Sequence, residues 1–591
     1  MASGRSKSRA KDGARADIEK ANAGKKANAR RQTTGNSGDA SGGESESVGF
    51  HALLFLAFFA ACLFTYQPAI HGDFISDDEH YVLNNAYVHD VTVDNLVAIF
   101  DPAGTPAKLV ENYAPIHLLM YMVEWQFFER DTTGYHVVNL FFHALASMLL
   151  FAVFRGSGIA RTPALLGSAF FALHPANVEA VAWISQLKTP TALCLSLCAL
   201  ILHRTRPAFA ALLFALSLFA KPTAAVAAFV LIAWAWLERS RAASAERESA
   251  PAFHWGWIGA WGLGLVLFAF AEFWAFNQTA GQAPVFYEDT LVRLRTVCAV
   301  SLRYVVMALT TYGLSVFQEP PAAASWFDPW WLGSLVLLVL LAWRMCERFF
   351  AQDLESLYWL WAAVSFAPIC GIIPLPFPMA DRYLYFILPG LIGGALLAGR
   401  SFASRFEVGA VAYKVAVGLA VVWIALLAFR VQQRAPIWRT AYAMMGDAEA
   451  HYPQGMAAQT RIARRLALAG DAEGTVRALE AARERGYNRL DHILNETAYN
   501  SIRSHPSFAA LVDDLAREWI DRYEAIEAPD QHEYRVMAQA YIVLDDLETA
   551  IERIRSGVAV GGPITAELEA DLEALLRSQR IRNSKLPPLN R

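Results

Sequence analysis

The sequence predicts an all-α protein in which a polytopic membrane bundle of about eleven helices precedes a soluble helical domain. Of the 591 residues, 55% are hydrophobic and only 18% are charged, whereas soluble domains carry about 25% charged residues. Long apolar runs alternate with short polar joints up to about residue 430, and the composition then changes abruptly to Ala, Glu, Arg and Leu. These three observations predict that most of the chain lies in lipid.

The charge and cysteine content exclude several classes of protein. The 51 Lys and Arg residues against 55 Asp and Glu residues give a net charge of −4, which excludes a nucleic-acid-binding protein defined by its bulk charge. The six cysteines form no CxxC pair and no ladder of loop cysteines. The cysteine pattern therefore predicts neither a zinc site nor a disulfide framework.

The chain begins with a polar, basic tail that lacks the apolar residues of a core. Residues 1–48 are rich in Ser, Gly, Ala, Asn and charge, which predicts disorder. The apolar run from Phe50 to Ile70 is too long for a cleaved signal peptide, so we interpret it as a signal anchor. Basic residues next to a first span favour a cytoplasmic N-terminus.

Residues 49–430 are predicted to form the membrane domain. Every second polar joint between its apolar runs is basic. The predicted spans lie near 50–69, 137–154, 162–175, 189–203, 208–220, 223–237, 254–274, 329–345, 357–372, 383–398 and 409–429. The basic joints place one face in the cytoplasm. Three segments are then predicted on the outer face within this domain, namely residues 71–135, 275–328 and 373–382.

The last region, residues 431–591, is predicted to be a helical domain on the non-cytoplasmic side. Two stretches, 463–482 and 538–554, share small residues at similar spacing. Small residues at this spacing let paired helices approach closely, which predicts tetratricopeptide repeats, whose period is about 34 residues. A plain helical bundle is the alternative interpretation.

Two adjacent carboxylates follow the first span directly. Asp77 and Asp78 lie in the run Gly72–His80, one step above the bilayer. Such a pair can orient a divalent metal, or one carboxylate can act as general base on an acceptor hydroxyl. The alternative is a hydrated acidic loop without a catalytic role.

Polar residues on one face of the second span form another candidate cluster. His136, Asn139 and His143 fall at i, i+3 and i+7, so they share a helix face. They could ligate a metal as a pair, or they could hydrogen-bond a neighbouring helix.

Cationic residues recur at the ends of apolar runs. His174, Glu179 and Lys188 lie around the joint between the third and fourth spans, Lys221 lies between two short apolar helices, and Arg382 follows a proline-rich stretch. Cations at the lipid–water boundary are typical of a phosphate site. An interfacial anchor is the alternative for the first joint.

Taken together, these motifs resemble the transmembrane and tetratricopeptide-repeat family of protein O-mannosyltransferases, which belong to the GT-C class of membrane glycosyltransferases. The resemblance covers about residues 50–445, and a bacterial relative is expected from the Ala- and Arg-rich composition. It rests on the order of Phe74–Asp78, Tyr135–Asn139 with His143, His174–Ser185, Ala220–Pro222 and Asp381–Tyr385.

The resemblance implies a polyprenyl-phosphate sugar donor, with mannose or another hexose, and a protein Ser or Thr hydroxyl as acceptor. It carries the catalytic base over to Asp77 or Asp78 and the contact with the donor phosphate to Arg382, with Lys188, His174 and Lys221 beside it. The supporting positions are Glu179, His136, Asn139, His143 and Tyr383.

The chain departs from the family pattern at two positions that bear on the site. Lys188 is followed by Thr189 where the family has an acid, and Ala114 stands before Pro115 where relatives often have Arg.

Composition and charge predict where the chain works. The Ala- and Arg-rich composition favours a multi-pass protein of the bacterial inner membrane, in contact with membrane lipids. The basic joints place the tetratricopeptide-like domain outside the cytoplasm, where we expect it to dock the acceptor. No nucleic-acid partner is expected. Two alternatives stay open: the same fold acting on a glycolipid or polysaccharide, and a non-catalytic assembly factor in which the membrane part only anchors the repeats.

Overall fold

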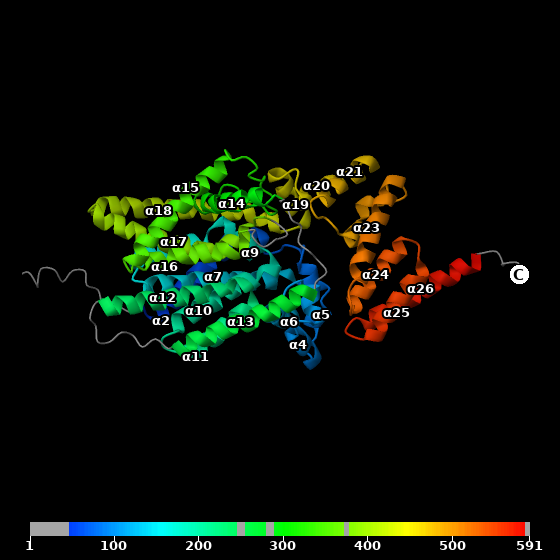
Figure 1. The fold of residues 1–591 in the computed structure, drawn as a ribbon, viewed down its shortest axis with the longest axis horizontal. Helices are drawn as coiled ribbons and strands as arrows, with labels where there is room; N and C mark the ends of the chain where they lie inside the picture. Colours follow the sequence, from blue (N-terminus) through cyan, green and yellow to red (C-terminus); the bar gives the residue numbers. More distant parts are fainter. Residues whose placement is uncertain (1–45, 245–254, 279–288, 371–377, 586–591) are drawn as a thin grey trace, which may run out of the picture. The chain divides into compact units, whose positions relative to one another are not determined.

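The structure of the protein, a computed structural model, describes residues 46–244, 255–278, 289–370 and 378–585. Every regular element in these ranges is a helix (Figure 1), apart from an isolated β-bridge between Gln318 and Met379. The predicted all-α class is confirmed. Most of the predicted tail 1–48 lies outside the described residues, as do residues 279–288 and 373–377 of the predicted outer segments and the last two residues of the predicted span 357–372.

Eight helices in the described ranges are long and apolar enough to cross a membrane, judged by length and composition. Each of them coincides with a span predicted from the sequence. They are Val48–Ala69, Thr132–Gly156, Ile184–Leu202, Pro222–Arg241, Gly256–Ala275, Pro329–Phe350, Asp381–Arg405 and Ala410–Trp438.

The other three predicted spans are short helices. α8 (Arg161–Ala172), α11 (Pro207–Ala220) and α16 (Glu355–Phe366) have 12, 14 and 12 residues. At 1.5 Å per residue they rise only about 18–21 Å, against a hydrocarbon core of about 30 Å. All eleven predicted spans are therefore helical, but three of them are too short to cross a bilayer on their own.

Small residues let the bundle helices approach closely. α16 packs along α17 (Leu384–Arg405), and a Cβ atom at Gly390 would lie 2.5 Å from the backbone nitrogen of Ala362. Close approach of this kind replaces the hydrophobic effect as the source of helix association in lipid. The remaining helices from the first span to the last are α2 (Val48–Tyr66), α7 (Thr132–Gly156), α10 (Lys188–Leu202), α12 (Val226–Ser244), α13 (Trp255–Gln278), α14 (Thr290–Thr310), α15 (Pro329–Phe350) and α18 (Ala410–Arg434).

The first predicted outer segment has its own apolar core, which rests on the joint between α8 and α10. Its helices are η2 (Glu79–Leu83), α3 (Ala86–His89), α4 (Val93–Phe100), α5 (Thr105–Leu109) and α6 (Pro115–Phe128). Buried side chains including Tyr81, Tyr121 and Tyr135 pack with Ile184 and Leu187 of the joint. This core positions the loop that carries the two adjacent carboxylates.

The C-terminal region is built from helices that pair with their neighbours in sequence. α20 (Met456–Leu468) packs on α21 (Ala472–Arg483), and α24 (Gln531–Val543) packs on α25 (Leu547–Val560). These two pairs coincide with the two stretches of similar pattern, while their assignment as tetratricopeptide repeats stays a prediction. The other helices are α19 (Ala441–His451), α22 (Leu490–Asn495), α23 (Pro506–Glu524) and α26 (Thr565–Lys585).

Candidate active site

The loop after α2 is fixed against the segment that follows α18. A Cβ atom at Gly72 would lie 3.1 Å from Arg439 Cα, so a larger side chain would push the two segments apart. The Trp183 indole N–H donates to the Ile75 carbonyl (3.3 Å), and the Trp183 ring stacks on Trp438 with centroids 5.4 Å apart. These contacts hold the loop at the joint between α8 and α10.

Asp78 is fully buried, and backbone groups occupy both of its carboxylate oxygens. The Ile75 N–H donates to Oδ2 (2.9 Å) and the Ser185 N–H donates to Oδ1 (2.7 Å). Burial raises the pKa of Asp78 to about 8, although the two N–H groups favour the carboxylate. Asp78 therefore joins the loop to η4 (Ile184–Gln186) and presents no oxygen at the surface.

Asp77, the residue before it, is partly exposed and lines a cavity. Its Oδ1 accepts a hydrogen bond from the Ser76 hydroxyl (3.2 Å), and its charge interacts with that of Arg382. Of the two predicted acids, Asp77 is the one that a ligand can reach.

Arg382 is held in place by Glu179. Its backbone N–H donates to Glu179 Oε2 (2.8 Å), and its guanidinium donates to Oε1 of the same buried carboxylate. The guanidinium carbon lies 5.5 Å from the centre of the Trp183 ring and 5.0 Å from that of Tyr383. Because a guanidinium has five N–H donors, and the side chain is 20% exposed, donors remain for an anion.

Lys188 is a buried cation whose partner is a neutral group. Its Nζ donates to the Tyr81 hydroxyl (2.8 Å) and lies 4.5 Å from the centre of that ring, with 8% of the residue exposed. Among the described residues no carboxylate lies within ion-pair distance of it. Glu272 on α13 interacts with it only from farther away, and that carboxylate accepts the Tyr113 N–H (3.2 Å).

Lys221 is likewise bound to neutral oxygens. Its Nζ donates to Thr189 Oγ1 (2.6 Å) and to Gln186 Oε1 (3.4 Å). Thr189 occupies the position at which the resembled family has an acid. The hydroxyl accepts the hydrogen bond but supplies no negative charge, and burial together with the charges of Lys188 and Arg382 lowers the pKa of Lys221 well below its usual range.

The structure thus brings Lys188, Lys221 and Arg382 near one another, with Glu179 paired to Arg382. The charge of Lys221 interacts with those of Lys188, Arg382 and Glu179. Glu179 pairs with Arg382, and among the described residues neither Lys188 nor Lys221 has a carboxylate within ion-pair distance. Buried charges without a counter-ion are costly, and a phosphate supplies both charge and acceptor oxygens. This cation cluster suits an anionic ligand.

The polar face of α7 makes hydrogen bonds within the protein. Asn139 Nδ2 donates to the carbonyls of Val181 (3.2 Å) and Trp183 (3.0 Å). The two ring nitrogens of His143 lie 2.9 Å from the Tyr385 hydroxyl and 2.9 Å from the Ala172 carbonyl. This geometry favours the helix-to-helix interpretation over metal ligation. The described residues contain no group of three or more His, Cys, Asp or Glu side chains that could hold a metal ion.

His136 and His174 contact the protein backbone and not the cations of the cluster. His136 is buried on α7 against the backbone of Gly72 and Ala182. His174 is fully buried, its Nδ1 accepts the Ala176 N–H (3.2 Å), and its Nε2 lies 3.1 Å from the Ala308 carbonyl. Burial lowers the pKa of His174 to about 4, so the ring is neutral near pH 7.

Two residues of the site escaped the sequence analysis. Tyr81 binds Lys188, and His117 on α6 is buried between the rings of Tyr81 (5.1 Å) and Tyr121 (4.4 Å). Burial, together with nearby Lys188, lowers the pKa of His117 well below its usual range. Neither carries a local signal, because a tyrosine and a histidine in an apolar helical segment are ordinary core residues.

Comparison with known proteins gives partial relatives only. No protein-family model matches the chain. The protein O-mannosyl-transferase F38B6.6 of Caenorhabditis elegans is 29% identical over 172 residues, which make up 27% of this chain and 24% of that protein. Tmtc1 of Drosophila melanogaster, named a protein O-mannosyl-transferase, is 33% identical over 125 residues, or 20% of this chain and 14% of the relative.

The mouse protein O-mannosyl-transferase TMTC3 is 28% identical over 131 residues, or 22% of this chain and 14% of that protein. The matched part of the chain thus spans a quarter or less of the length of each of these relatives. The chain is a distant, partial relative of the TMTC-type proteins.

Proposed function

We propose that the protein is an integral-membrane glycosyltransferase of the GT-C class. It moves a hexose, with mannose as the first candidate, from a polyprenyl-phosphate donor to Ser or Thr hydroxyls of proteins. The observation that carries this proposal is the cation cluster of Lys188, Lys221 and Arg382 with the partly exposed Asp77 beside it. The names of the distant relatives support the same activity.

In the proposed reaction, Asp77 and the cation cluster act on opposite sides of one displacement. Asp77 accepts the proton of the acceptor hydroxyl, whose oxygen forms a bond to the anomeric carbon of the sugar. The bond between that carbon and the phosphate oxygen breaks, and the electron pair leaves with the phosphate. Arg382, Lys188 and Lys221 stabilise the phosphate as its charge grows. A single displacement inverts the anomeric centre.

In this proposal the supporting residues position the reacting groups and do not contact the substrates. Asp78 and Trp183 hold the loop that carries Asp77, and Glu179 orients Arg382. Tyr383 lies against the guanidinium, and His174, His136, Asn139 and His143 stabilise the surrounding helices. The lipid chains of the donor stay in the bilayer, so the phosphate reaches the cluster from the membrane interface.

The proposed setting is a bacterial inner membrane, with the N-terminus in the cytoplasm and the C-terminal helices on the other side. The alternation of basic joints supports this orientation. The C-terminal helices, as tetratricopeptide-like repeats, would then meet acceptor proteins outside the cytoplasm.

Intact-mass analysis of envelope proteins tests the proposal. Cells would make the wild-type chain, Asp77→Asn, Arg517→Glu as a matched surface variant, or no chain. We expect hexose-sized additions on Ser or Thr in wild-type and Arg517→Glu cells that vanish with Asp77→Asn at an equal protein level. Identical profiles in all four strains would refute protein glycosylation and favour a glycolipid acceptor or a non-catalytic assembly factor.

A further inference from the structure

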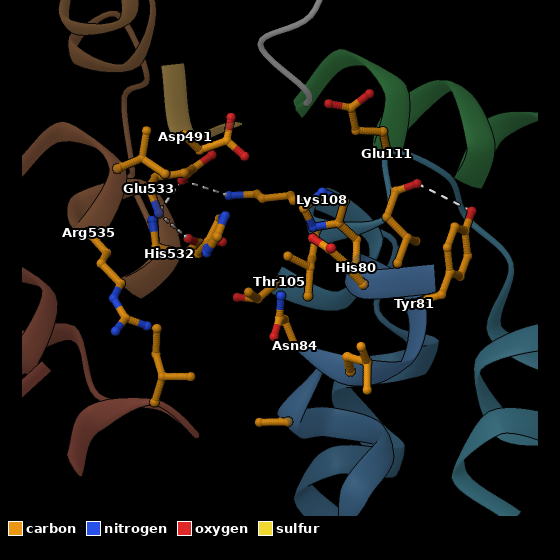
Figure 2. A pocket seen from close by; sticks show the side chains of 18 of the residues that line it. His80, Tyr81, Asn84, Thr105, Lys108, Glu111, Asp491, His532, Glu533 and Arg535 are labelled. Carbon is orange, nitrogen blue, oxygen red and sulfur yellow. Dashed lines mark hydrogen bonds and ion pairs between the residues drawn. The ribbon is translucent and has the colours of Figure 1, made fainter. Parts of the chain in front are cut away.

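A large cavity lies between the first predicted outer segment and the C-terminal helices. Its volume is about 840 Å³, within the range of about 300–1,000 Å³ that is usual for ligand sites. Figure 2 shows Lys108 and His80 on one wall facing Glu533 and His532 on the other. Lys108 Nζ lies 3.8 Å from Glu533 Oε2, so a single long ion pair joins the two walls there.

The cavity reaches the candidate active site through two side chains. Asp77 and Tyr81 both line it. The Tyr81 hydroxyl accepts the hydrogen bond of Lys188, and Asp77 interacts with Arg382. A molecule in the cavity can therefore contact the proposed base directly, whereas Tyr81 lies between the cavity and Lys188.

The charges along the cavity are only partly paired. Three ion pairs use six of its charged side chains: Lys108 with Glu533, Arg489 with Asp491 and Arg535 with Glu567. Among the residues that the structure describes, the other charged side chains of the lining form no ion pair: Asp77, Glu79, Glu111 and Arg130 on one wall, and Arg522 and Asp530 on the other. The charge of Glu79 interacts with that of Arg489 from farther away. Charged groups without partners favour a ligand that carries charges of both signs.

These features distinguish between kinds of acceptor. A neutral glycan would form no ion pair with these carboxylates and guanidinium groups, and a lipid chain would bury them against hydrocarbon. An extended peptide offers backbone hydrogen bonds and side chains of either charge. The chemistry of the cavity therefore selects a polypeptide.

We propose that this cavity binds an extended segment of the acceptor protein and delivers its Ser or Thr hydroxyl to Asp77. Glu79 favours a basic side chain close to the hydroxyl residue, because Glu79 lies two positions from Asp77. Arg522 favours an acidic side chain farther along the segment. This inference rests on the proposed transferase function and names its acceptor site.

A peptide competition tests this inference. Purified full-length protein in lipid nanodiscs would receive polyprenyl-phosphate mannose and a pool of 12-residue peptides. Each peptide would contain one Ser or Thr, with Lys, Asp or Ala at defined positions around it. Mass spectrometry then counts the peptides that gain a hexose. Arg522→Glu reverses one wall charge, and Arg517→Glu serves as the matched control, since Arg517 lies on the same helix α23, pairs with Asp514 and is outside the cavity lining.

We expect the wild type and Arg517→Glu to prefer peptides with a basic and an acidic residue over their alanine counterparts. Arg522→Glu should lower kcat/KM for peptides with the acidic residue about tenfold, through KM, because one charged contact is lost and reversed. Glu79→Lys should reverse the preference for the basic residue in the same way.

Two results would overturn the inference while transfer itself stands. One is an identical peptide preference for Arg522→Glu and Arg517→Glu. The other is a wild type that modifies envelope proteins in cells but none of the peptides. If the wild type modifies neither peptides nor envelope proteins, the proposed function fails, and the acceptor site fails with it.

Discussion

Two sets of buried or half-buried polar residues, all of them candidates from the sequence, differ in the partners of their polar groups. Asn139, His143, His174 and Asp78 bind mainly backbone groups, which are fixed parts of the fold. The ammonium groups of Lys188 and Lys221 contact only neutral oxygens. Both sets interrupt apolar runs, so burial alone does not separate them.

Cationic side chains without an ion-pair partner in the described ranges, rather than burial, therefore distinguish the candidate site from the structural residues. A side chain that makes its full set of hydrogen bonds to backbone stabilises the fold, typically by about 1 kcal/mol for each bond. An unpaired buried cation costs stability until a counter-ion binds. Such a cation lowers stability in the free protein and contributes affinity when its ligand is present.

The largest expected effect separates the two adjacent carboxylates. Asp77→Asn should lower kcat about 10²–10⁴-fold, the usual contribution of a general base, without a change in thermal unfolding. Asp78→Asn should instead destabilise the protein, since its amide cannot accept both backbone N–H groups, and keep kcat per folded molecule. Transfer kinetics and thermal unfolding in nanodiscs check this pair. Equal loss of kcat in both variants at equal stability would remove the distinction.

The second effect concerns donor binding. Lys188→Met and Lys221→Met should each raise the KM for the polyprenyl-phosphate donor about 10–100-fold, because each removes a charged contact with the phosphate. Neither substitution should lower the unfolding temperature of the free protein, because each removes a cation that has no ion-pair partner among the described residues and therefore costs stability. Lys414→Met, at an exposed position on α18, serves as the control. A marked loss of stability with an unchanged donor KM would place these lysines with the structural set.

A third and smaller effect is expected for the polar residues of α7 that hydrogen-bond within the protein. Asn139→Leu and His143→Phe leave backbone carbonyls and the Tyr385 hydroxyl without partners, and should lower the free energy of unfolding by about 1–3 kcal/mol. The donor KM of the folded fraction should stay within twofold of wild type. Urea or thermal unfolding with parallel kinetics measures both. If a divalent metal stabilised the wild type but neither variant, metal ligation by this helix face would be supported instead.

The last effect is a pH dependence of stability, with a slope of at most about 1.4 kcal/mol per pH unit for one group. Because burial raises the pKa of Asp78 to about 8 from an ordinary value of 3.8, the folded state binds the extra proton between these values. Stability should therefore fall as pH rises from about 4 to about 8. The unfolding temperature of wild type minus that of Asp78→Asn, followed from pH 5 to 9, isolates this group. A difference that grows with pH would mean that Asp78 is ionised in the folded protein.

Local pattern predicted the elements but not the pairs of residues that meet. All eleven apolar runs form helices, because length and composition determine a helix in lipid. The choice between Asp77 and Asp78 depends on the Ser185 N–H, 107 residues away, and Lys188 meets Tyr81 over the same separation. Arg382 and Glu179 are 203 residues apart. Sequence periodicity does not predict contacts over such separations. The candidate residues could therefore be predicted from the sequence, whereas their partners could be seen only in the structure.

The three short helices have a consequence for the surrounding lipid. α8 leads into the α9 segment (Val178–Ala182) that carries Glu179, α11 ends at the residue before Lys221, and α16 precedes the stretch that leads to Arg382. Helices about 10 Å shorter than the hydrocarbon core are accommodated by thinning of the adjacent bilayer. We therefore expect the membrane to be thinned beside the cation cluster, so that a lipid phosphate meets the cluster below the mean headgroup plane. Hydrophobic mismatch would then make the transfer rate depend on acyl-chain length, with thick bilayers slowing it.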